Sequence, residues 1–261
     1  MKESWEKSTK LRRSKIGGNK LKLVVDTHTH TIASGHAYST IQEMAKEASV
    51  NGIEMFAITD HGPAMQGAPC LFHFSNLRVV PSELYGVRIL KGVEANIIDY
   101  NGNLDMPEEY LRRLDFVIAS LHDVCIEPAS KKEHTNAYLN LMKNPYVDAI
   151  GHPGTPKFEV DVEKVVSAAK EYGKFIEINN TSFRVRAGCE ENCMEFAMEC
   201  KKQGVKIVCG SDAHISFDVG RFEKVYNLLE KVDMPEELIM NTNVANFDEF
   251  IENKRKRIRK G

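Results

Sequence analysis

The chain has 261 residues, 42% of them hydrophobic and 28% charged, so it can bury a sizeable core without disulfide bonds. Its 35 Lys and Arg against 37 Asp and Glu give a net charge of −2, which argues neither for nor against a polyanionic partner. No signal peptide or bilayer-length apolar run is recognisable, so we expect no membrane partner and a cytoplasmic chain with six reduced cysteines.

The two ends of the chain are basic. Residues 1–20 contain little apolar sequence and are predicted to be a flexible basic leader. The last eight residues, KRKRIRKG, contain six Lys or Arg and are predicted to form a solvated basic tail. A weak nucleic-acid contact is the minority interpretation of both ends.

Seven short apolar runs are predicted to be strands, namely 21–26, 54–59, 88–94, 115–121, 147–152, 174–179 and 206–211. Apolar i, i+3, i+4 spacing predicts helices between or after them at 40–50, 135–143, 161–172, 191–203, 222–232 and 245–256. Ser39 or Thr40 and Asp161 are suitable N-caps. The Gly- and Pro-rich stretch 62–87 is the least regular part of the chain.

This alternation predicts an α/β protein with a parallel sheet. Seven units in one series favour a distorted (β/α)7 barrel of the TIM-like kind, closed or nearly closed, with a site at the C-terminal strand ends. The alternative is an open doubly wound sheet, although no Gly-rich dinucleotide fingerprint follows the first strand. No linker interrupts residues 21–261, which we interpret as a single domain.

Residues able to bind metals gather at the ends of the predicted strands. Seven of the nine histidines lie there, and only His73 and His134 lie elsewhere and remain unassigned. Because the C-terminal ends of parallel barrel strands converge on one mouth, the pattern predicts a multinuclear metal centre. Its nine candidate ligands are His28, His30, His36, His61, Glu94, His122, His152, Asp212 and His214.

Nine ligands suit three divalent ions better than one or two, because a catalytic ion needs roughly three protein ligands. With two carboxylates and a bridging hydroxide, three dications leave an excess of about +3, which suits a phosphate dianion. Asp26 and Asp60 adjoin ligands, and each either orients a ligand imidazole or merely caps a strand end. Asp123 is a weaker candidate for the same role.

The motifs together resemble the PHP (polymerase and histidinol phosphatase) superfamily. The local strings HAYST, FAITDHGPAM, EANI, HPGTPK, EINNTSF and GSDAH are similar to its stand-alone YcdX-like phosphatases. The resemblance covers most of residues 23–250 and leaves out both basic ends.

The resemblance implies a trinuclear centre, usually with zinc and in some members with manganese or iron. One ion would take His28, His30, Glu94 and Asp212, a second His36, His61 and His214, and a third Glu94, His122 and His152. The implied reaction is hydrolysis of a phosphate ester, with a metal-bridging hydroxide as nucleophile and Glu94 and Asp212 as its supporting carboxylates. We expect a small phosphorylated substrate.

The loop NNTSFRVRAG after the sixth strand can complete a phosphate site. Arg184 and Arg186 would clamp the phosphate and Asn180 would donate a hydrogen bond, whereas surface arginines are the plain alternative. Three rival functions remain at this stage. They are a nuclease using the same centre on phosphodiesters, a metal-dependent amidohydrolase, and a regulatory or metal-storage module. The oligomeric state is not specified by the sequence.

Overall fold

Seven parallel strands form a sheet that is nearly closed into a barrel, as predicted, in this computed structural model, which describes residues 14–16 and 19–260. The strands are β3 (Val25–Thr29), β4 (Met55–Ile58), β6 (Val87–Asn96), β7 (Phe116–Ser120), β8 (Ala149–Ile150), β9 (Phe175–Asn179) and β10 (Ile207–Gly210). The short β5 (Glu83–Leu84) pairs antiparallel with β6. The fold class is therefore confirmed, and the open doubly wound alternative is wrong.

The barrel closes between its first and last strands. The backbone N–H of Asp212 donates to His28 O at 2.8 Å, and that of His30 donates to Ala213 O at 2.8 Å. Both hydrogen bonds join the C-terminal end of β3 to the segment that follows β10, which is the end of the barrel where the candidate ligands lie. The mouth is thus fixed by backbone hydrogen bonds as well as by side chains.

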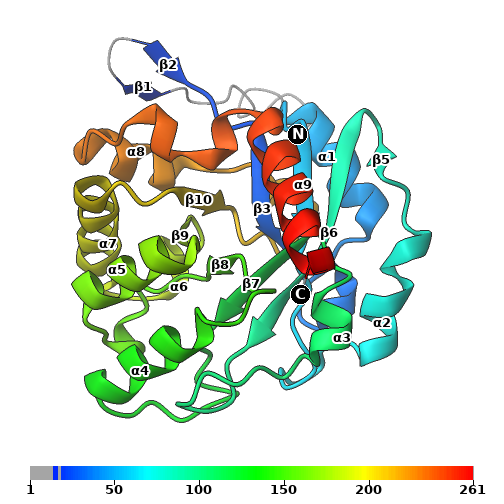
Figure 1. Ribbon diagram of the computed structural model, residues 1–261. Helices are drawn as coiled ribbons and strands as arrows, with labels where there is room; N and C mark the ends of the chain where they lie inside the picture. Colours follow the sequence, from blue (N-terminus) through cyan, green and yellow to red (C-terminus); the bar gives the residue numbers. More distant parts are fainter. Residues whose placement is uncertain (1–13, 17–18, 261) are drawn as a thin grey trace.

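Helices surround the strands (Figure 1). They are α1 (Ile41–Val50), α2 (Leu71–Asn76), α3 (Glu108–Leu111), α4 (Lys131–Leu141), α5 (Val162–Tyr172), α6 (Ser182–Val185), α7 (Cys189–Gln203), α8 (Glu223–Lys231) and α9 (Val244–Lys260). Thr40 caps α1 in a capping box with Glu43, and Asp161 caps α5, as predicted. Within the described residues no helix is long and apolar enough to cross a lipid bilayer.

The beginning of the chain differs from the prediction. The first barrel strand starts at Val25 rather than at residue 21, because residues Asn19–Leu21 form β2, which pairs antiparallel with β1 (Ser14–Ile16). The predicted flexible leader therefore contains two paired strands, and residues 1–13 and 17–18 lie outside the described part of the chain. The stretch 62–87, predicted to be irregular, contains α2 and β5.

The barrel interior changes from apolar to polar along its axis. At the N-terminal ends of the strands, Val25, Phe116 and Phe175 belong to one buried apolar cluster. Further along two of the strands the buried residues are acidic: Glu177 follows Phe175 by two residues on β9, and Glu94 follows Leu90, another member of the cluster, by four on β6. The side chains of successive inward positions thus divide the interior into an apolar floor and a polar mouth.

The C-terminal helix α9 closes the apolar end of the barrel, in front of the strands in Figure 1. Phe247 and Ile251 belong to the interior cluster, and the ring of Phe247 lies 6.0 Å from that of Phe116. Lys254 is buried and pairs with the buried carboxylate of Asp148. The prediction of a solvated basic tail is therefore wrong at Lys254, because one face of the basic stretch continues an amphipathic helix that packs on the barrel.

We expect Lys254→Met to destabilise the fold by about 3–5 kcal/mol, because it leaves the Asp148 carboxylate buried without its cation. The measurement is urea unfolding followed by circular dichroism. Lys256→Met is the matched control, since Lys256 is exposed and pairs with the exposed Glu252 one helical turn away; it should change stability little. Equal midpoints for the two variants would contradict a structural role for the buried pair.

Candidate metal centre

Glu94 lies at the centre of the histidine cluster. Its Oε1 atom lies 2.9 Å from His152 Nε2 and 3.3 Å from His122 Nε2. Its Oε2 atom lies 2.9 Å from His61 Nδ1, 3.2 Å from His28 Nε2 and 3.4 Å from His30 Nε2. One carboxylate therefore faces five imidazoles, with each of its oxygens shared by at least two of them.

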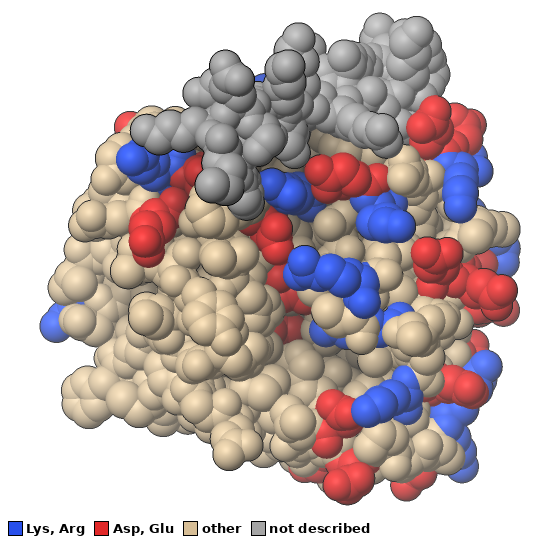
Figure 2. Space-filling view, turned by 180° about the vertical axis from the view of Figure 1, so that it is seen from behind, with Lys and Arg blue, Asp and Glu red and all other residues tan. Residues whose placement is uncertain are grey.

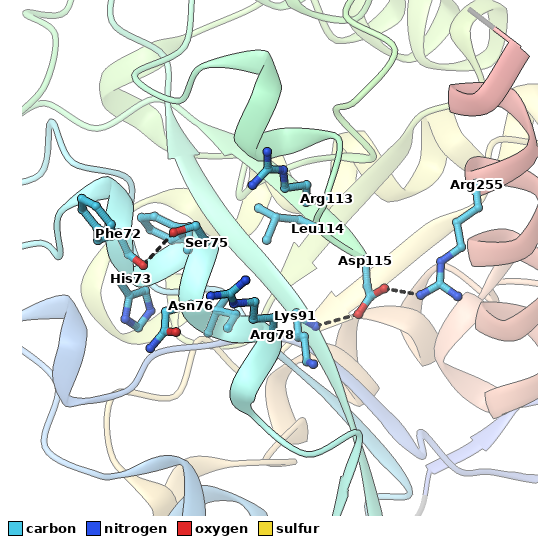
Figure 3. A pocket seen from close by; sticks show the side chains of 12 residues that line it. Phe72, His73, Ser75, Asn76, Arg78, Lys91, Arg113, Leu114, Asp115 and Arg255 are labelled. Carbon is cyan, nitrogen blue, oxygen red and sulfur yellow. Dashed lines mark hydrogen bonds and ion pairs between the residues drawn. The ribbon is translucent and has the colours of Figure 1, made fainter.

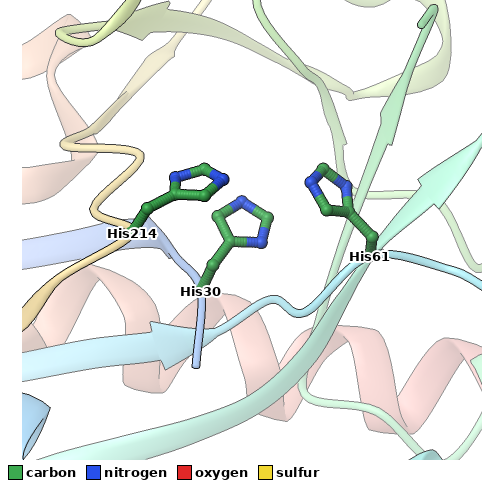
Figure 4. A group of neighbouring side chains, drawn as sticks. All are labelled: His30, His61 and His214. Atoms are coloured by element: carbon green, nitrogen blue, oxygen red, sulfur yellow. The ribbon is translucent and has the colours of Figure 1, made fainter. Parts of the chain in front are cut away.

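Asp212 supplies the second carboxylate from the segment after β10. Its Oδ1 atom lies 3.2 Å from His30 Nε2 and 3.5 Å from His214 Nδ1. The rings of His30, His61 and His214 come from three different strand ends and surround a common space (Figure 4). The exposed His36 completes the outer edge, with its ring centroid 5.0 Å from that of His61 and 4.9 Å from that of His214.

Three overlapping groups in the described residues have ligand atoms within 4.8 Å of one another. They are His28 with His30 and Asp212, His30 with His61 and His214, and His61 with Glu94 and His122. Each group shares at least two members with one of the three ligand sets that the sequence resemblance implied. His36 and His152 lie at the edges of the cluster and belong to none of these groups.

Two candidate ligands adopt a backbone conformation that is unusual for residues with a side chain. His152 has φ of 28° and Asp212 has φ of 56°, and both side chains are nevertheless buried. Residues other than glycine rarely have positive φ, and such strain persists where the surroundings over-determine it. Both residues lie two positions past the end of a strand, His152 after β8 and Asp212 after β10.

The site holds more buried negative charge than the protein itself compensates. Glu94, Glu177 and Asp212 are each at most 4% exposed. Among the described residues, Arg186 is the only Lys or Arg within ion-pair distance of any of them, at 3.7 Å from Asp212 Oδ2. Buried carboxylates are costly unless cations neutralise them. The donor set therefore calls for positive charge in the space between the imidazoles.

The pKa shifts of two candidate ligands, His30 and His152, favour metal binding, whereas that of His28 favours its charged form. Burial and the neighbouring imidazole of His61 lower the pKa of His30 to about 3, and burial with the Arg186 charge lowers that of His152 to about 4. Both rings are thus neutral at neutral pH, which is the form that ligates metals. Although burial opposes a charged His28, the Glu177, Glu94 and Asp212 carboxylates raise its pKa well above the usual value.

The residues fit divalent cations. The buried Nδ1 atom of His61 makes no hydrogen bond within the described chain, although Glu94 Oε2 lies only 2.9 Å away. The facing Nε2 atoms of His28 and His30 are 3.0 Å apart and both point toward the carboxylates. A cation in this space would satisfy the orphaned nitrogen and the surplus negative charge together.

Several residues that orient the cluster escaped the sequence analysis. Glu177 Oε1 accepts from His28 Nδ1 at 2.7 Å, and its Oε2 accepts from the backbone N–H of His152 at 2.7 Å. Asn96 Oδ1 lies 2.8 Å from His122 Nδ1, and Ser34 Oγ lies 3.1 Å from His30 Nδ1. For Glu177 the sequence did carry a signal, because it is an acidic residue inside the otherwise apolar predicted strand KFIEIN.

Gly210 is required beside this arrangement. A Cβ atom at that position would lie 2.3 Å from Glu177 Oε1 and 2.4 Å from His28 Cβ. Only glycine therefore lets β10 pass the Glu177–His28 pair at this distance.

Asp26 and Asp60 play different parts. Asp26 accepts hydrogen bonds from the backbone N–H groups of His28, Ser211 and Gly220, so it joins strand ends and contacts no imidazole in the described chain. Asp60 Oδ1 accepts a hydrogen bond from the Ser34 hydroxyl at 2.7 Å. Because Ser34 Oγ also lies 3.1 Å from His30 Nδ1, Asp60 is linked to His30 through Ser34. Asp123 pairs with Lys157 at the edge of the site.

The two unassigned histidines also have places. His73 Nε2 lies 3.2 Å from Asp60 Oδ2, so α2 contacts the chain of polar groups that ends at His30. His134 accepts a hydrogen bond from the backbone N–H of Ala129 and donates to Glu159 O, far from the cluster in sequence and in contacts. We therefore assign His134 to the support of α4.

A cavity of about 320 Å³ opens over the cluster. Arg184 and Arg186 line it together with His36, His122 and Asp212, and the Arg186 guanidinium is held by Ser182 Oγ at 2.9 Å. Asn180, predicted to contact phosphate, does not line this cavity; its Oδ1 accepts from the backbone N–H of Lys224 at the start of α8. The two arginines are thus brought to the site and Asn180 is not.

A larger cavity of about 820 Å³ lies beside α2 and away from the cluster (Figure 3). Arg78, Lys91 and Arg113 line it, and Asp115 bonds to Arg255 and to the Lys91 backbone. None of the nine candidate ligands lines this cavity, so we place the chemistry in the smaller one.

Comparisons with known proteins show the family to which the chain is related. Residues 26–185 match the PHP domain family. A probable phosphatase from Acetivibrio thermocellus is 75% identical over 240 residues, covering 92% of this chain and all of its own length. A probable phosphatase from Caldanaerobacter subterraneus is 57% identical, covering 93% of this chain and 96% of its own.

The fold is also similar to a solved structure. The histidinol phosphate phosphatase of Lactococcus lactis, solved with zinc, L-histidinol and phosphate, aligns with a TM-score of 0.59 and 19% identity, over 81% of this chain and 94% of that one. At this identity the likeness concerns the fold alone.

We expect Glu177→Gln to weaken metal binding by about 10–100-fold, because an amide cannot accept from both His28 and the His152 N–H. Metal content after dialysis against a graded chelator is the measurement. Glu171→Gln, an exposed change on α5, is the control and should bind metal like the parent protein. Full metal affinity in Glu177→Gln would refute its orienting role.

Proposed function

Because the chain belongs to the PHP domain family, we propose that it is a phosphomonoesterase that works with three divalent ions, zinc in the first instance. The chain is a phosphatase-type hydrolase, in keeping with relatives up to 75% identical that are named probable phosphatases. The observation that carries the finer proposal is the Glu94 carboxylate, which faces five imidazoles with its two oxygens.

The three ions would be held by overlapping ligand sets. We assign His28, His30, Glu94 and Asp212 to the first, His36, His61 and His214 to the second, and Glu94, His122 and His152 to the third. The support for this division is the three mutually close groups in the cluster and the surplus of buried carboxylate. Bound there, the ions would supply a hydroxide-strength nucleophile at neutral pH and neutralise phosphoryl charge.

The protein's own residues prepare this chemistry. Glu177, Asn96 and Ser34 fix the second ring nitrogens of His28, His122 and His30, so the other nitrogen of each ring faces inward. Arg186, anchored on Ser182, presents its guanidinium in the cavity wall to phosphoryl oxygens. Arg184 is more exposed and bonded to Asp218, so it can contact substrate only at the cavity edge.

The test combines metal analysis with three substrates. Zinc-reconstituted protein should bind close to three ions per chain and hydrolyse p-nitrophenyl phosphate faster than bis(p-nitrophenyl) phosphate or single-stranded DNA. Preference for the diester or DNA would replace the phosphomonoesterase with a nuclease. Fewer than two ions, or no turnover of any ester after reconstitution, would overturn the proposal.

Glu94→Gln should lower kcat/KM for p-nitrophenyl phosphate by at least ~100-fold and reduce bound metal, since one bridging charge is lost from two ion sites. Circular dichroism should show an intact fold. Glu83→Gln, an exposed change on β5, is the control and should keep parent rates and metal content. Unchanged kinetics in Glu94→Gln would refute the bridging assignment.

A further inference from the structure

The carboxylate of Asp105 joins two segments that carry candidate ligands. Asp105 lies in the loop between β6 and α3. Its Oδ1 atom accepts from the backbone N–H of Asn96 at 2.9 Å, and its Oδ2 atom accepts from the backbone N–H of Ala64 at 2.9 Å. Asn96 is the last residue of β6, and Ala64 lies three residues after His61. The carboxylate therefore ties the end of β6 to the segment that follows β4.

The same carboxylate fixes the side-chain amide of Asn96, which is fully buried. Asn96 Nδ2 donates to Asp105 Oδ2 at 2.6 Å and to Gly62 O at 3.0 Å, so there is an acceptor for each of its two N–H bonds. The amide oxygen, Asn96 Oδ1, is left to face His122 Nδ1 at 2.8 Å. Because an amide oxygen can only accept, the proton of this hydrogen bond must lie on His122 Nδ1.

The opposite orientation of the Asn96 amide would be unfavourable. It would place Oδ1 against the Asp105 carboxylate and the Gly62 carbonyl oxygen, so that three acceptors would meet without a proton. It would also turn the NH2 group toward His122 Nδ1, and a neutral ring would then carry its proton on Nε2. His122 Nε2 is the atom that faces Glu94 Oε1, at 3.3 Å, and in that form it could not bind a metal ion.

Asp105 is placed for hydrogen bonding and not for an ion pair. On the face seen from behind the view of Figure 1, many acidic side chains lie beside Lys or Arg (Figure 2). The half-buried Asp105 carboxylate instead has only N–H donors as partners in the described chain. Gly62 permits this approach, because a Cβ atom at that position would lie 2.4 Å from each of the two carboxylate oxygens.

We propose that Asp105 is a positioning residue of the metal centre, which acts through Asn96 to keep the proton of His122 on Nδ1 and leave Nε2 free for a metal ion. In the described chain the Asp105 carboxylate makes no hydrogen bond to a candidate ligand. Its consequence for metal binding rests on the proposed function, in which His122 binds the third ion. The position of the proton does not rest on it, because the hydrogen bonds that determine it involve no ion.

The proton on His122 Nδ1 can be observed in proton–nitrogen correlation spectra of the imidazole side chains, with His122→Gln to identify its signals. The parent protein should carry a proton on Nδ1 of this ring, both zinc-loaded and metal-free. Asp105→Asn should lose most of that signal, because the new amide can donate toward Asn96 and let the Asn96 amide turn over.

Asp99→Asn is the matched control for this substitution. Asp99 lies in the same loop and also accepts from two backbone N–H groups, those of Asn101 and Asn103, and from the side-chain amide of Asn103. None of its partners bonds to a candidate ligand. Asp99→Asn should therefore keep the parent spectrum and the parent zinc affinity.

Zinc affinity, measured by competition with a graded chelator, tests the consequence for the metal centre. Asp105→Asn should weaken the binding of one zinc ion by about 10–100-fold, with the circular dichroism spectrum unchanged. Asn96→Ala should cause a similar loss. Adding Asp105→Asn to Asn96→Ala should then cause little further loss, because the two residues act on His122 by one route.

A His122 proton on Nε2 instead of Nδ1 in the parent protein would overturn the proposal without any variant. So would parent-like spectra in Asp105→Asn, or losses of zinc affinity that multiply in the double variant, since Asp105 would then act by another route. A changed spectrum with unchanged zinc affinity would support the positioning of His122 and refute its place as a ligand in the proposed function. No substrate enters these measurements, so failure of the phosphomonoesterase would leave their outcome unaffected.

Discussion

The buried carboxylate of Glu94 is the constraint on which the site depends. It lies on the longest strand of the barrel, and five imidazoles from the ends of four other strands point at its two oxygens. Burial opposes its ionisation, but the surrounding His28, His122 and His61 hold its pKa well below the usual value. A buried ionised carboxylate requires positive charge nearby. The strand order and the closure of the barrel place the imidazole rings around this carboxylate.

The barrel meets this requirement by separating two environments along its axis. Aromatic and aliphatic side chains fill the floor, and α9 seals it, so the rigid strands project their ends at fixed positions. Beyond the floor, Glu177 and Asn96 hold ring nitrogens from within the strands, which is a firmer support than loops give. His152 and Asp212 keep positive φ angles while their side chains are buried in this polar half of the barrel.

Much of this arrangement could be predicted from the sequence alone, because the apolar patterns of strands and of helices each depend on residues that are close together in the chain. Apolar runs of strand length and the residue that ends each run place the nine candidate ligands at one mouth. Glu177 was harder to identify, since its partners His28 and His152 lie 149 and 25 residues away in the sequence. In the sequence Glu177 appears only as one charged residue within an apolar run. Asp26 was ambiguous for the same reason, because Ser211 and Gly220 become its neighbours only on closure. The prediction of a solvated tail was wrong at Lys254, because the basic residues continue the helix whose apolar face, with Phe247 and Ile251, packs on the barrel.

The position of α9 has a consequence for the order in which the barrel can be completed during folding. The interior cluster draws on Val25 near the start and on Phe247 and Ile251 near the end. During folding the floor therefore stays open until α9 packs against the strands, and its aromatic rings remain exposed until that contact forms. His28 and His30 likewise come close to Asp212 and His214 only when the segment after β10 bonds to β3. A metal ion that needs ligands from both segments could therefore bind only in the closed barrel.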